Sequence, residues 1–450
     1  MRDLLVMALV LISLPLAFWR PFWGLLTYTW LAYMRPQDLA WTVGDDRFSL
    51  WVAGAMLLGL VLWVGRERLV TFEPQTVLLL LYFLWISFTV YNALLPEMSE
   101  FAYSAFWKVA LVSVLTTGLV RTQERWRMLL LVTGFSLGVL GLKYGIHGVI
   151  RQGARFNHGP GGFMRDNNDF ALAMNMALPL LVAIALTERS RGVRIAAWVM
   201  AGFTLLTVIF TFSRGGLLTM AVVGLLVVAR SRQKVLAAAL LGFAALGFFF
   251  FSSETFRADY TARTQTINEY EEDGSAMGRL NAWKTSWLVF LDYPVAGVGP
   301  SNLSLVYQRY APGDGPVRVS HNTYLQLLSE SGLPALALFL ALIGATLIRL
   351  QKLAARGPDW TRVHARMLQI SIVAFMVGST FLNRAFFDLI YHLVALSVCL
   401  GLAATAPATA TAAPASVPRE PVVPWWRTAP SQAVRTSPAS PGSPSWAGRG

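Results

Sequence analysis

The sequence has little of the polar chemistry on which soluble enzymes rely. Charged residues make up only 14% of its 450 residues, whereas 55% are hydrophobic and the mean hydropathy is +0.52. A soluble domain could not keep this composition in solution, but a bundle of membrane-spanning helices requires it. Cysteine occurs once, as Cys399 in an apolar run, so disulfides within the chain are excluded and a cysteine-based metal site is disfavoured.

The formal net charge of +13 does not indicate a nucleic-acid partner. Sixteen Lys and Arg residues lie in five short connections between apolar runs, which together hold only 47 residues. This is the positive-inside pattern of membrane proteins, so the basic charge sets the topology. The five connections are Gly65–Pro74, Arg121–Arg127, Glu188–Arg194, Arg230–Lys234 and Arg349–Arg366.

Apolar runs dominate the rest of the chain. Eleven runs are long enough, or nearly so, to cross the bilayer core as helices. They are Phe48–Val64, Gln75–Leu94, Phe101–Val120, Trp126–Ile146, Phe170–Thr187, Val193–Phe212, Leu217–Ala229, Val235–Phe251, Thr323–Ile348, Met367–Leu382 and Ala385–Ala404. The earlier stretch Leu4–Met34 supplies either two short helices broken at Arg20-Pro21 or one span with an interfacial piece. We therefore predict an all-α polytopic membrane protein with 12 or 13 transmembrane helices.

Three regions can be distinguished along the chain. Residues 1–150 are predicted to be N-terminal transmembrane helices, the first of them uncleaved because no small-x-small site follows it. Residues 151–405 form a core that includes one large polar loop, 254–322, with eight acidic and six basic residues. The positive-inside rule places this loop, which is expected to carry short helices, on the outer, periplasm-like side of the membrane. Residues 406–450, rich in Pro, Ala, Ser and Thr, are expected to form a disordered cytoplasmic tail.

The connections on the outer side hold most of the remaining polar side chains. The segment Arg155–Asp169 is rich in Gly and Asn, which predicts a turn-rich loop with Asn168 or Asp169 as the cap of the next helix. Between two apolar runs lies Thr211-Phe-Ser-Arg214-Gly-Gly216. An arginine at this depth either snorkels to the surface or binds a counter-charge such as a ligand phosphate, and the glycines allow close approach.

The polar loop contributes three more arginines, Arg257, Arg263 and Arg279. Guanidinium groups match the oxygens of phosphate, although the first two could instead pair with the acidic residues between positions 269 and 273. Arg279 stands at the start of an amphipathic helix suited to lie on the membrane surface. Its apolar stripe is formed by Leu280, Trp283, Trp287 and Phe290.

The loop closes on Ser320-His321-Asn322-Thr323, directly before an apolar helical run. Ser320, Asn322 or Thr323 could cap that helix. A histidine at a helix N-terminus feels the positive end of the dipole, which disfavours the imidazolium form and keeps a basic lone pair available near neutral pH. His321 could therefore be a general base, or simply a hydrogen-bonded interfacial histidine.

Taken together, these motifs resemble the O-antigen ligase/polymerase superfamily of bacterial membrane glycosyltransferases. Each motif is weak alone, but their order and their placement in the loops are specific. The resemblance spans roughly residues 162–402. It is carried by Ser213-Arg-Gly215, Arg279-Leu-Asn-Ala-Trp283, Pro294-Val-Ala-Gly-Val-Gly-Pro300 and His321-Asn-Thr-Tyr-Leu-Gln-Leu-Leu-Ser-Glu-Ser-Gly-Leu-Pro334.

A narrower resemblance extends to the N-terminal half. The segments Arg2-Asp-Leu-Leu, Arg20-Pro-Phe-Trp-Gly and Arg165-Asp-Asn-Asn-Asp169 are similar to those of O-glycosylation ligases associated with exosortase systems. The chain departs from the superfamily pattern in having serine, in place of the commoner alanine, before His321. Arg257 and Arg263 match no fixed signature of the family, so only their position in the loop recommends them.

The resemblance implies inverting transfer of a glycan from undecaprenyl diphosphate to an acceptor hydroxyl at the periplasmic face. It implies His321 as the catalytic base and Arg214, Arg279 and the weaker candidate Arg257 as ligands of the diphosphate. No Asp-x-Asp appears in the outer loops and no nucleotide-binding motif is present, so we expect neither a metal ion nor another cofactor. The acceptor would be an exported protein, a lipid or a saccharide, and membrane lipid surrounds the chain.

Two alternatives remain open from the sequence. A growing glycan as acceptor would make the chain an O-antigen-type polysaccharide polymerase. A many-helix bundle with interior arginines could also be a transporter or flippase of lipid-linked glycans. Transporters tend to show repeated halves and polar residues at mid-helix, whereas ionisable residues here cluster at the ends of the apolar runs, Lys108 and Lys143 excepted.

Overall fold

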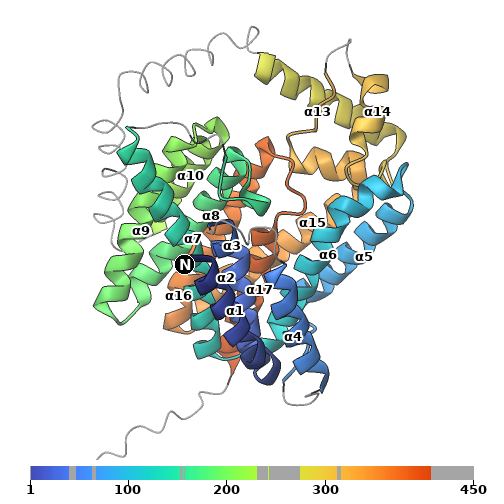
Figure 1. Cartoon of the computed structure of the whole chain (residues 1–450). Coiled ribbons are helices and arrows are strands. Elements are labelled where there is room, and N and C mark those ends of the chain that lie inside the picture. The colour runs from blue at the N-terminus through green and yellow to red at the C-terminus, as the bar shows by residue number, and fades with distance from the viewer. Residues whose placement is uncertain are drawn as a thin grey trace, which may run out of the picture. The chain divides into compact units, whose positions relative to one another are not determined.

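The computed structural model describes residues 2–39, 47–62, 67–152, 156, 158–230, 242, 274–311 and 316–406. These residues are almost entirely helical and include no strand, which confirms the predicted all-α class (Figure 1). The helices are α1 (Arg2–Trp19), α2 (Pro21–Met34), α3 (Pro36–Leu39), α4 (Phe48–Leu62), α5 (Pro74–Tyr91), α6 (Pro96–Leu119), α7 (Gln123–Ile150), α8 (Asn167–Thr187), α9 (Arg191–Phe210), α10 (Arg214–Arg230), α13 (Gly274–Asp292), α14 (Leu303–Tyr310), α15 (Thr323–Arg356), α16 (Asp359–Gly378) and α17 (Asp388–Thr405), with 3-10 turns η1 (Gly162–Met164) and η2 (Ser379–Phe381).

Eight of the described helices, α5 to α9 and α15 to α17, are long and apolar enough to cross a membrane. The shorter helices α1, α4 and α10 are also apolar, so the prediction of a polytopic membrane protein is confirmed. The N-terminal stretch forms two helices, because Pro21 opens α2 at a position where its missing N–H costs nothing. The predicted span Val235–Phe251, apart from Gly242, and the tail beyond Ala406 lie outside the described residues.

The core of the bundle is built around α8, whose side chains are almost all buried. A helix that is apolar on every face needs neighbours on every side, and α8 packs against α7, α9, α10 and α16. Glycines on one face of α7 allow its neighbours to come close. A methyl group on Gly134 would lie 2.5 Å from Ile184, and one on Gly141 would lie 2.1 Å from the Thr204 hydroxyl. Small residues play this part in membrane bundles because they bring backbones together.

Helix α15 is broken in its first half. Gly332 has a φ of +78°, outside the helical range, and Pro334 has no N–H to donate to the carbonyl of Glu330. Only glycine fits at position 332, because a methyl group there would lie 1.8 Å from the carbonyl oxygen of Val295. The break brings the chain just after α13 into direct contact with α15.

The turn 294–300 replaces the hydrogen bonds that α15 loses at the break. The N–H of Val298 donates to the carbonyl of Ser329 at 2.9 Å. The N–H of Gly299 donates to the carbonyl of Glu330, also at 2.9 Å. Buried carbonyls must find partners, and here they find them in a loop. Two of the motifs picked out in the sequence, the Gly-x-Gly turn and the Gly-x-Pro segment, therefore form one interlocked structural unit.

Buried Asn302 fastens the end of this turn to the connection between α5 and α6. Its Oδ1 accepts a hydrogen bond from the N–H of Leu95 at 2.7 Å, and its Nδ2 donates to the hydroxyl of Ser99 at 2.8 Å. The turn is thus held from both sides, by α15 and by the α5–α6 connection. It forms a rigid wall beside the candidate site.

Candidate active site

Five connections that carry residues discussed below lie at one end of the bundle, which we call the site end. The last two of them along the chain are joined directly by the hydrogen bond from Ser320 to Asn383. The opposite end, with the short connections rich in Lys and Arg, is the basic end. The connections of the site end are 151–166, 211–213, 293–302, 316–322 and 379–387.

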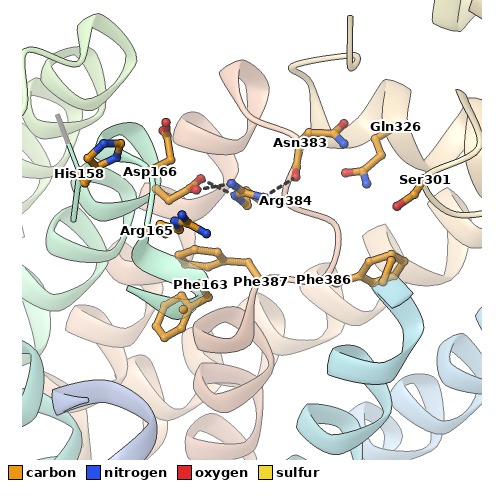
Figure 2. Close-up of a pocket in the computed structure, with 13 residues that line it drawn as sticks. His158, Phe163, Arg165, Asp166, Ser301, Gln326, Asn383, Arg384, Phe386 and Phe387 are labelled. Atoms are coloured by element: carbon orange, nitrogen blue, oxygen red, sulfur yellow. Dashed lines mark hydrogen bonds and ion pairs between the residues drawn. The ribbon is translucent and has the colours of Figure 1, made fainter. Parts of the chain in front are cut away.

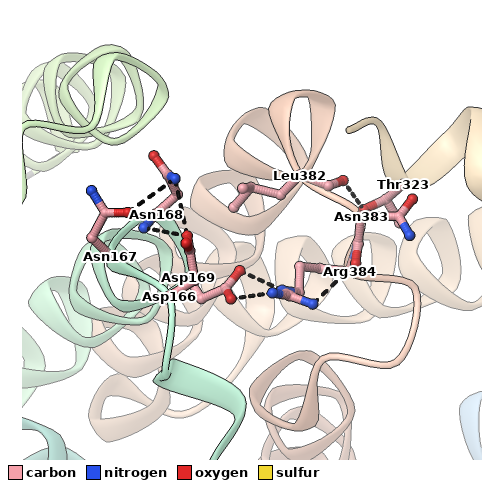
Figure 3. Close-up of polar contacts among 8 residues, drawn as sticks. All are labelled: Asp166, Asn167, Asn168, Asp169, Thr323, Leu382, Asn383 and Arg384. Carbon is pink, nitrogen blue, oxygen red and sulfur yellow. Dashed lines mark hydrogen bonds and ion pairs between the residues drawn. The ribbon is translucent and has the colours of Figure 1, made fainter. Parts of the chain in front are cut away.

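The start of α15 is fixed to the connection between α16 and α17. Asn322 caps the helix, because its Oδ1 accepts hydrogen bonds from the N–H groups two and three residues further on, at 3.0 and 3.1 Å. The hydroxyl of Thr323 donates to the carbonyl of Leu382 at 2.8 Å and accepts from the N–H of Arg384 at 2.9 Å (Figure 3). Of the three predicted cap residues, Asn322 is therefore the one that acts.

His321 lies directly before this cap and is half-buried. Its φ of +47° is left-handed, a conformation that histidine tolerates better than most residues. Ser320 beside it is buried and donates a hydrogen bond to Oδ1 of Asn383. Burial lowers the pKa of His321 below its ordinary 6.5, and the positive charges of Arg279 and Arg318 lower it further. A lower pKa favours the neutral imidazole, and its causes here are burial and neighbouring guanidinium groups rather than the helix dipole.

Two arginines from different segments lie together beside this imidazole. Arg279 is on α13, and the guanidinium of Arg318 covers the adjacent Gly278, where a methyl group would lie 2.5 Å from Cζ. Arg384 also lowers the pKa of the histidine, whereas Asp166 raises it. Three positive charges and one negative charge therefore act on the histidine, so an anionic ligand would be attracted to this place.

Helix α13 is present, but it begins at Gly274, so Arg279 lies in its second turn and not at its start as predicted. This helix packs against α14 and α15, and Ala282 and Val289 are among its buried residues. Of the predicted stripe, Leu280 and Trp287 are exposed, whereas Trp283 and Phe290 are half-buried. This orientation leaves apolar side chains outward on a helix that carries Arg279.

Arg214 is the first residue of α10 and is exposed. Ser213 caps this helix, since its hydroxyl accepts a hydrogen bond from the N–H of Gly216 at 3.0 Å. Gly215 packs against Phe381 of η2, where an added methyl group would lie 3.3 Å from Cβ of that residue. The start of α10 therefore touches the connection that also carries Asn383 and Arg384.

Of the four predicted site residues, His321, Arg279, Arg214 and Arg257, the structure describes the first three. It brings His321 and Arg279 close enough for their charges to interact. It places Arg214 at the same end of the bundle, linked to the others through η2. Arg257 lies outside the described residues.

A pocket of about 520 Å³ opens at the site end (Figure 2). Its lining does not include the predicted residues, but Asp166 and Arg384 belong both to this lining and to the charges that act on His321. In the part of the chain that the structure describes, no group of three or more His, Cys, Asp or Glu side chains could hold a metal ion. The pocket is lined by Ala102, His158, Gly162, Phe163, Arg165, Asp166, Asp169, Ser301, Gln326, Asn383, Arg384, Phe386 and Phe387.

The central polar contact of the pocket is an ion pair that the sequence analysis missed. Nε and Nη2 of Arg384 donate to the two oxygens of the buried Asp169 carboxylate, which joins α8 to the α16–α17 connection (Figure 3). Asp169 was predicted as a possible cap of α8, as was Asn168, and both predictions are wrong. Asp166 is the cap, with its carboxylate accepting from the N–H of Asn168 at 2.8 Å. The available signal was Asn383-Arg384, a polar dipeptide between two apolar runs.

Gln326 and Glu330, one turn apart on α15, support the opposite wall. Nε2 of Gln326 donates to the buried carboxyl group of Glu330 at 3.1 Å, and its Oε1 accepts from the N–H of Ala385 at 3.1 Å. The N–H of Ser301 also donates to the Glu330 carboxyl group. Ser301 has a left-handed φ of +62°, and such strain persists only where neighbours enforce it. Glu330 thus positions two residues of the pocket wall at once.

Comparison with known families gives two matches. Residues 195–340 match the O-antigen ligase family, a range that contains Arg214, Arg279 and His321. Residues 1–172 match a family of unknown function, and this range contains Arg165 and Asp169. Arg384 lies beyond both matches. No curated protein matches the chain.

Proposed function

We propose that this chain, whose residues 195–340 match the O-antigen ligase family, transfers a glycan from undecaprenyl diphosphate to an acceptor hydroxyl. The reaction takes place at the periplasmic face of the inner membrane, where the positive-inside rule puts the site end. The narrower resemblance to exosortase-associated ligases favours a Ser or Thr hydroxyl of an exported protein as the acceptor.

One observation carries this proposal: a half-buried imidazole lies among guanidinium groups at one end of the bundle, where burial and their positive charges lower its pKa. In the reaction, His321 removes the proton from the acceptor hydroxyl while the oxygen attacks the anomeric carbon of the glycan. The bond between that carbon and the diphosphate oxygen breaks, and the lipid diphosphate leaves with the bonding electrons. Attack from the face opposite the leaving group inverts the anomeric centre.

Positive charge is needed where the diphosphate departs, because negative charge develops there. Arg279 supplies it beside His321, and Arg214 supplies it at the start of α10. Arg257 remains a further candidate in the polar loop. Guanidinium groups keep their charge at any physiological pH and donate two parallel hydrogen bonds, so they take the role that a divalent cation has in metal-dependent transferases.

The direct test is transfer in vitro by the full-length purified chain. Lipid-linked glycan is supplied in the presence of a chelator, and an exported protein, a lipid A core and a growing glycan are offered in turn as acceptors. Transfer to the protein with inversion supports the proposal, and transfer to the growing glycan would make the chain a polymerase. Failure with every acceptor would contradict a ligase.

A separate measurement distinguishes a ligase from a flippase. Deleting the chain from its host should leave complete lipid-linked glycan at the outer face of the membrane, where a non-permeant reagent can label it. A flippase defect would instead strand the glycolipid on the cytoplasmic side.

A further inference from the structure

The pocket at the site end differs in charge from the surroundings of His321. Apart from a histidine, its ionisable lining consists of two arginines and two aspartates. Arg384 is bound to Asp169, and Asp166 is engaged as the cap of α8. Because these charges balance, the pocket is poorly matched to a diphosphate. A neutral ligand with many polar groups suits it better.

One side of the pocket is aromatic. Figure 2 shows Phe163, Phe386 and Phe387 below the polar side chains in that view. Each of these rings packs against another ring: the centroid of Phe386 lies 4.9 Å from that of Phe106, and those of Phe163 and Phe387 are 5.0 Å apart in an edge-on arrangement. The negative face of such a ring attracts the slightly positive C–H groups of a pyranose.

The other side offers amide and hydroxyl groups in fixed positions. Gln326 is held at both ends of its amide, and Asn383 is held by the hydrogen bond from Ser320. Ser301 projects from the rigid turn beside them (Figure 2). Amides both donate and accept hydrogen bonds, as a sugar hydroxyl does. Preset polar groups facing aromatic rings suit a hydroxylated ring.

We propose that this pocket is a sugar-binding subsite, in which a pyranose ring stacks on Phe386 and its hydroxyls bond to Asn383 and Gln326. Its volume lies within the range of roughly 300–1,000 Å³ that is usual for small-molecule sites. The charges of Arg384 and Asp166 reach His321, so the subsite adjoins the proposed base. The inference rests on the proposed function for the source of the sugar, which is either the lipid-linked glycan or a saccharide acceptor.

The test compares Phe386→Leu, which keeps an apolar side chain but loses the ring, with Phe386→Tyr, which keeps the ring. Both full-length variants are purified in detergent and checked for an unchanged melting temperature. Binding is measured for two probes: undecaprenyl diphosphate, and lipid-linked glycan extracted from host cells that lack the chain. If the donor supplies the ring, the wild type and Phe386→Tyr should prefer the glycan-bearing lipid. In Phe386→Leu the ratio of the two affinities, lipid-linked glycan over undecaprenyl diphosphate, should fall by roughly 3- to 10-fold. Its affinity for undecaprenyl diphosphate itself should not change.

Steady-state transfer identifies the source of the sugar. A donor sugar in the pocket raises the KM of Phe386→Leu for the lipid-linked glycan, whereas an acceptor sugar raises its KM for a saccharide acceptor. The proposal of a sugar-binding subsite would be overturned if Phe386→Leu kept both the wild-type preference for the glycan-bearing lipid and the wild-type KM values. Failure of the proposed function is a different result, in which the wild type neither binds undecaprenyl diphosphate nor transfers glycan.

Discussion

The two ends of the helix bundle use arginine in different ways. At the basic end, arginines form ion pairs with carboxylates on other segments, and these pairs tie neighbouring segments together. At the site end, the charges of three arginines from separate segments act on a single imidazole, that of His321. The pairs at the basic end are Arg125–Glu67 (2.7 Å), Arg127–Glu188 (2.6 Å) and Arg349–Glu73 (2.7 Å).

The difference teaches that the number of arginines does not mark a functional site in a membrane protein. The basic end has more of them, because topology requires it. What distinguishes the site end is that guanidinium groups converge on a titratable side chain held in a left-handed conformation beside a pocket. Arg384 shows that both uses occur there, since it pairs with Asp169 and also acts on His321.

Replacing His321 is expected to have the largest effect, because the site end differs from the basic end in the charges that act on this imidazole. His321→Ala should lower transfer by about 10²- to 10⁴-fold, the usual contribution of a general base. Transfer is measured in membranes that contain equal amounts of folded wild-type and variant protein. His321→Gln, which keeps hydrogen-bonding groups but cannot accept the proton, should be as inactive. A fully active alanine variant would reject His321 as the base.

Matched arginine substitutions at the two ends come next in expected effect. Arg279→Ala should lower kcat by about 10²-fold in the molecules that remain folded, because one charged donor to the leaving group is lost. Arg349→Ala breaks a partly buried ion pair with Glu73 and should instead lower the free energy of unfolding by roughly 1–3 kcal/mol. Transfer by the molecules that remain folded should be unaffected. Equal losses of activity in the two variants would erase the distinction between the ends.

Two glycines of α15 allow the same comparison for the backbone. Gly332→Ala places a methyl group against the Val295 carbonyl at a positive φ, so it should detach the turn 294–300 and lower both melting temperature and transfer. Gly344→Ala, nearer the basic end, meets nothing within 4 Å. It should be neutral or stabilising by up to about 1 kcal/mol. Melting curves of the two purified variants decide this, and a Gly332→Ala protein as stable as the wild type would count against the interlocked unit.

The pH dependence of transfer gives the smallest expected effect. Since the pKa of His321 lies below 6.5, the base is neutral at pH 7 and activity should fall only when the pH drops below that pKa. Removing the positive charge of Arg279 raises this pKa, so the acid limb of kcat/KM should move to higher pH in Arg279→Ala. Profiles recorded between about pH 5 and 8 for both proteins show the shift. If the acid limb does not move, the charge of Arg279 does not affect the pKa of the catalytic base.

The fold and part of the site could be predicted from the sequence. Apolar runs of membrane length fix the long helices, since backbone groups in a bilayer can be satisfied only within helices or closed barrels. His321 was a candidate because it lies at the border of such a run, and Arg279 because it lies beside an apolar stripe within the polar loop. The role of Asn322 as a cap was among the predicted possibilities for the same local reason.

The pocket could not be predicted, because its contacts join residues far apart in the chain. Asp169 and Arg384 are 215 positions apart, and each looks locally like an ordinary helix-end residue. Likewise, nothing local shows that the amide of Gln326 bonds both to Glu330 and to the backbone of Ala385. Periodicity and capping rules describe neighbours in sequence, whereas a pocket depends on tertiary packing.

The break in α15 has a consequence for the way the protein is assembled. Within this helix the carbonyl of Glu330 would face Pro334, which has no hydrogen to give, and hydrocarbon offers none either. Its partner, the N–H of Gly299, belongs to a turn that the ribosome makes before α15. The backbone of α15 is therefore fully hydrogen-bonded at its break only after the turn 294–300 has docked, so this part of the helix reaches its final form together with a segment that lies outside it.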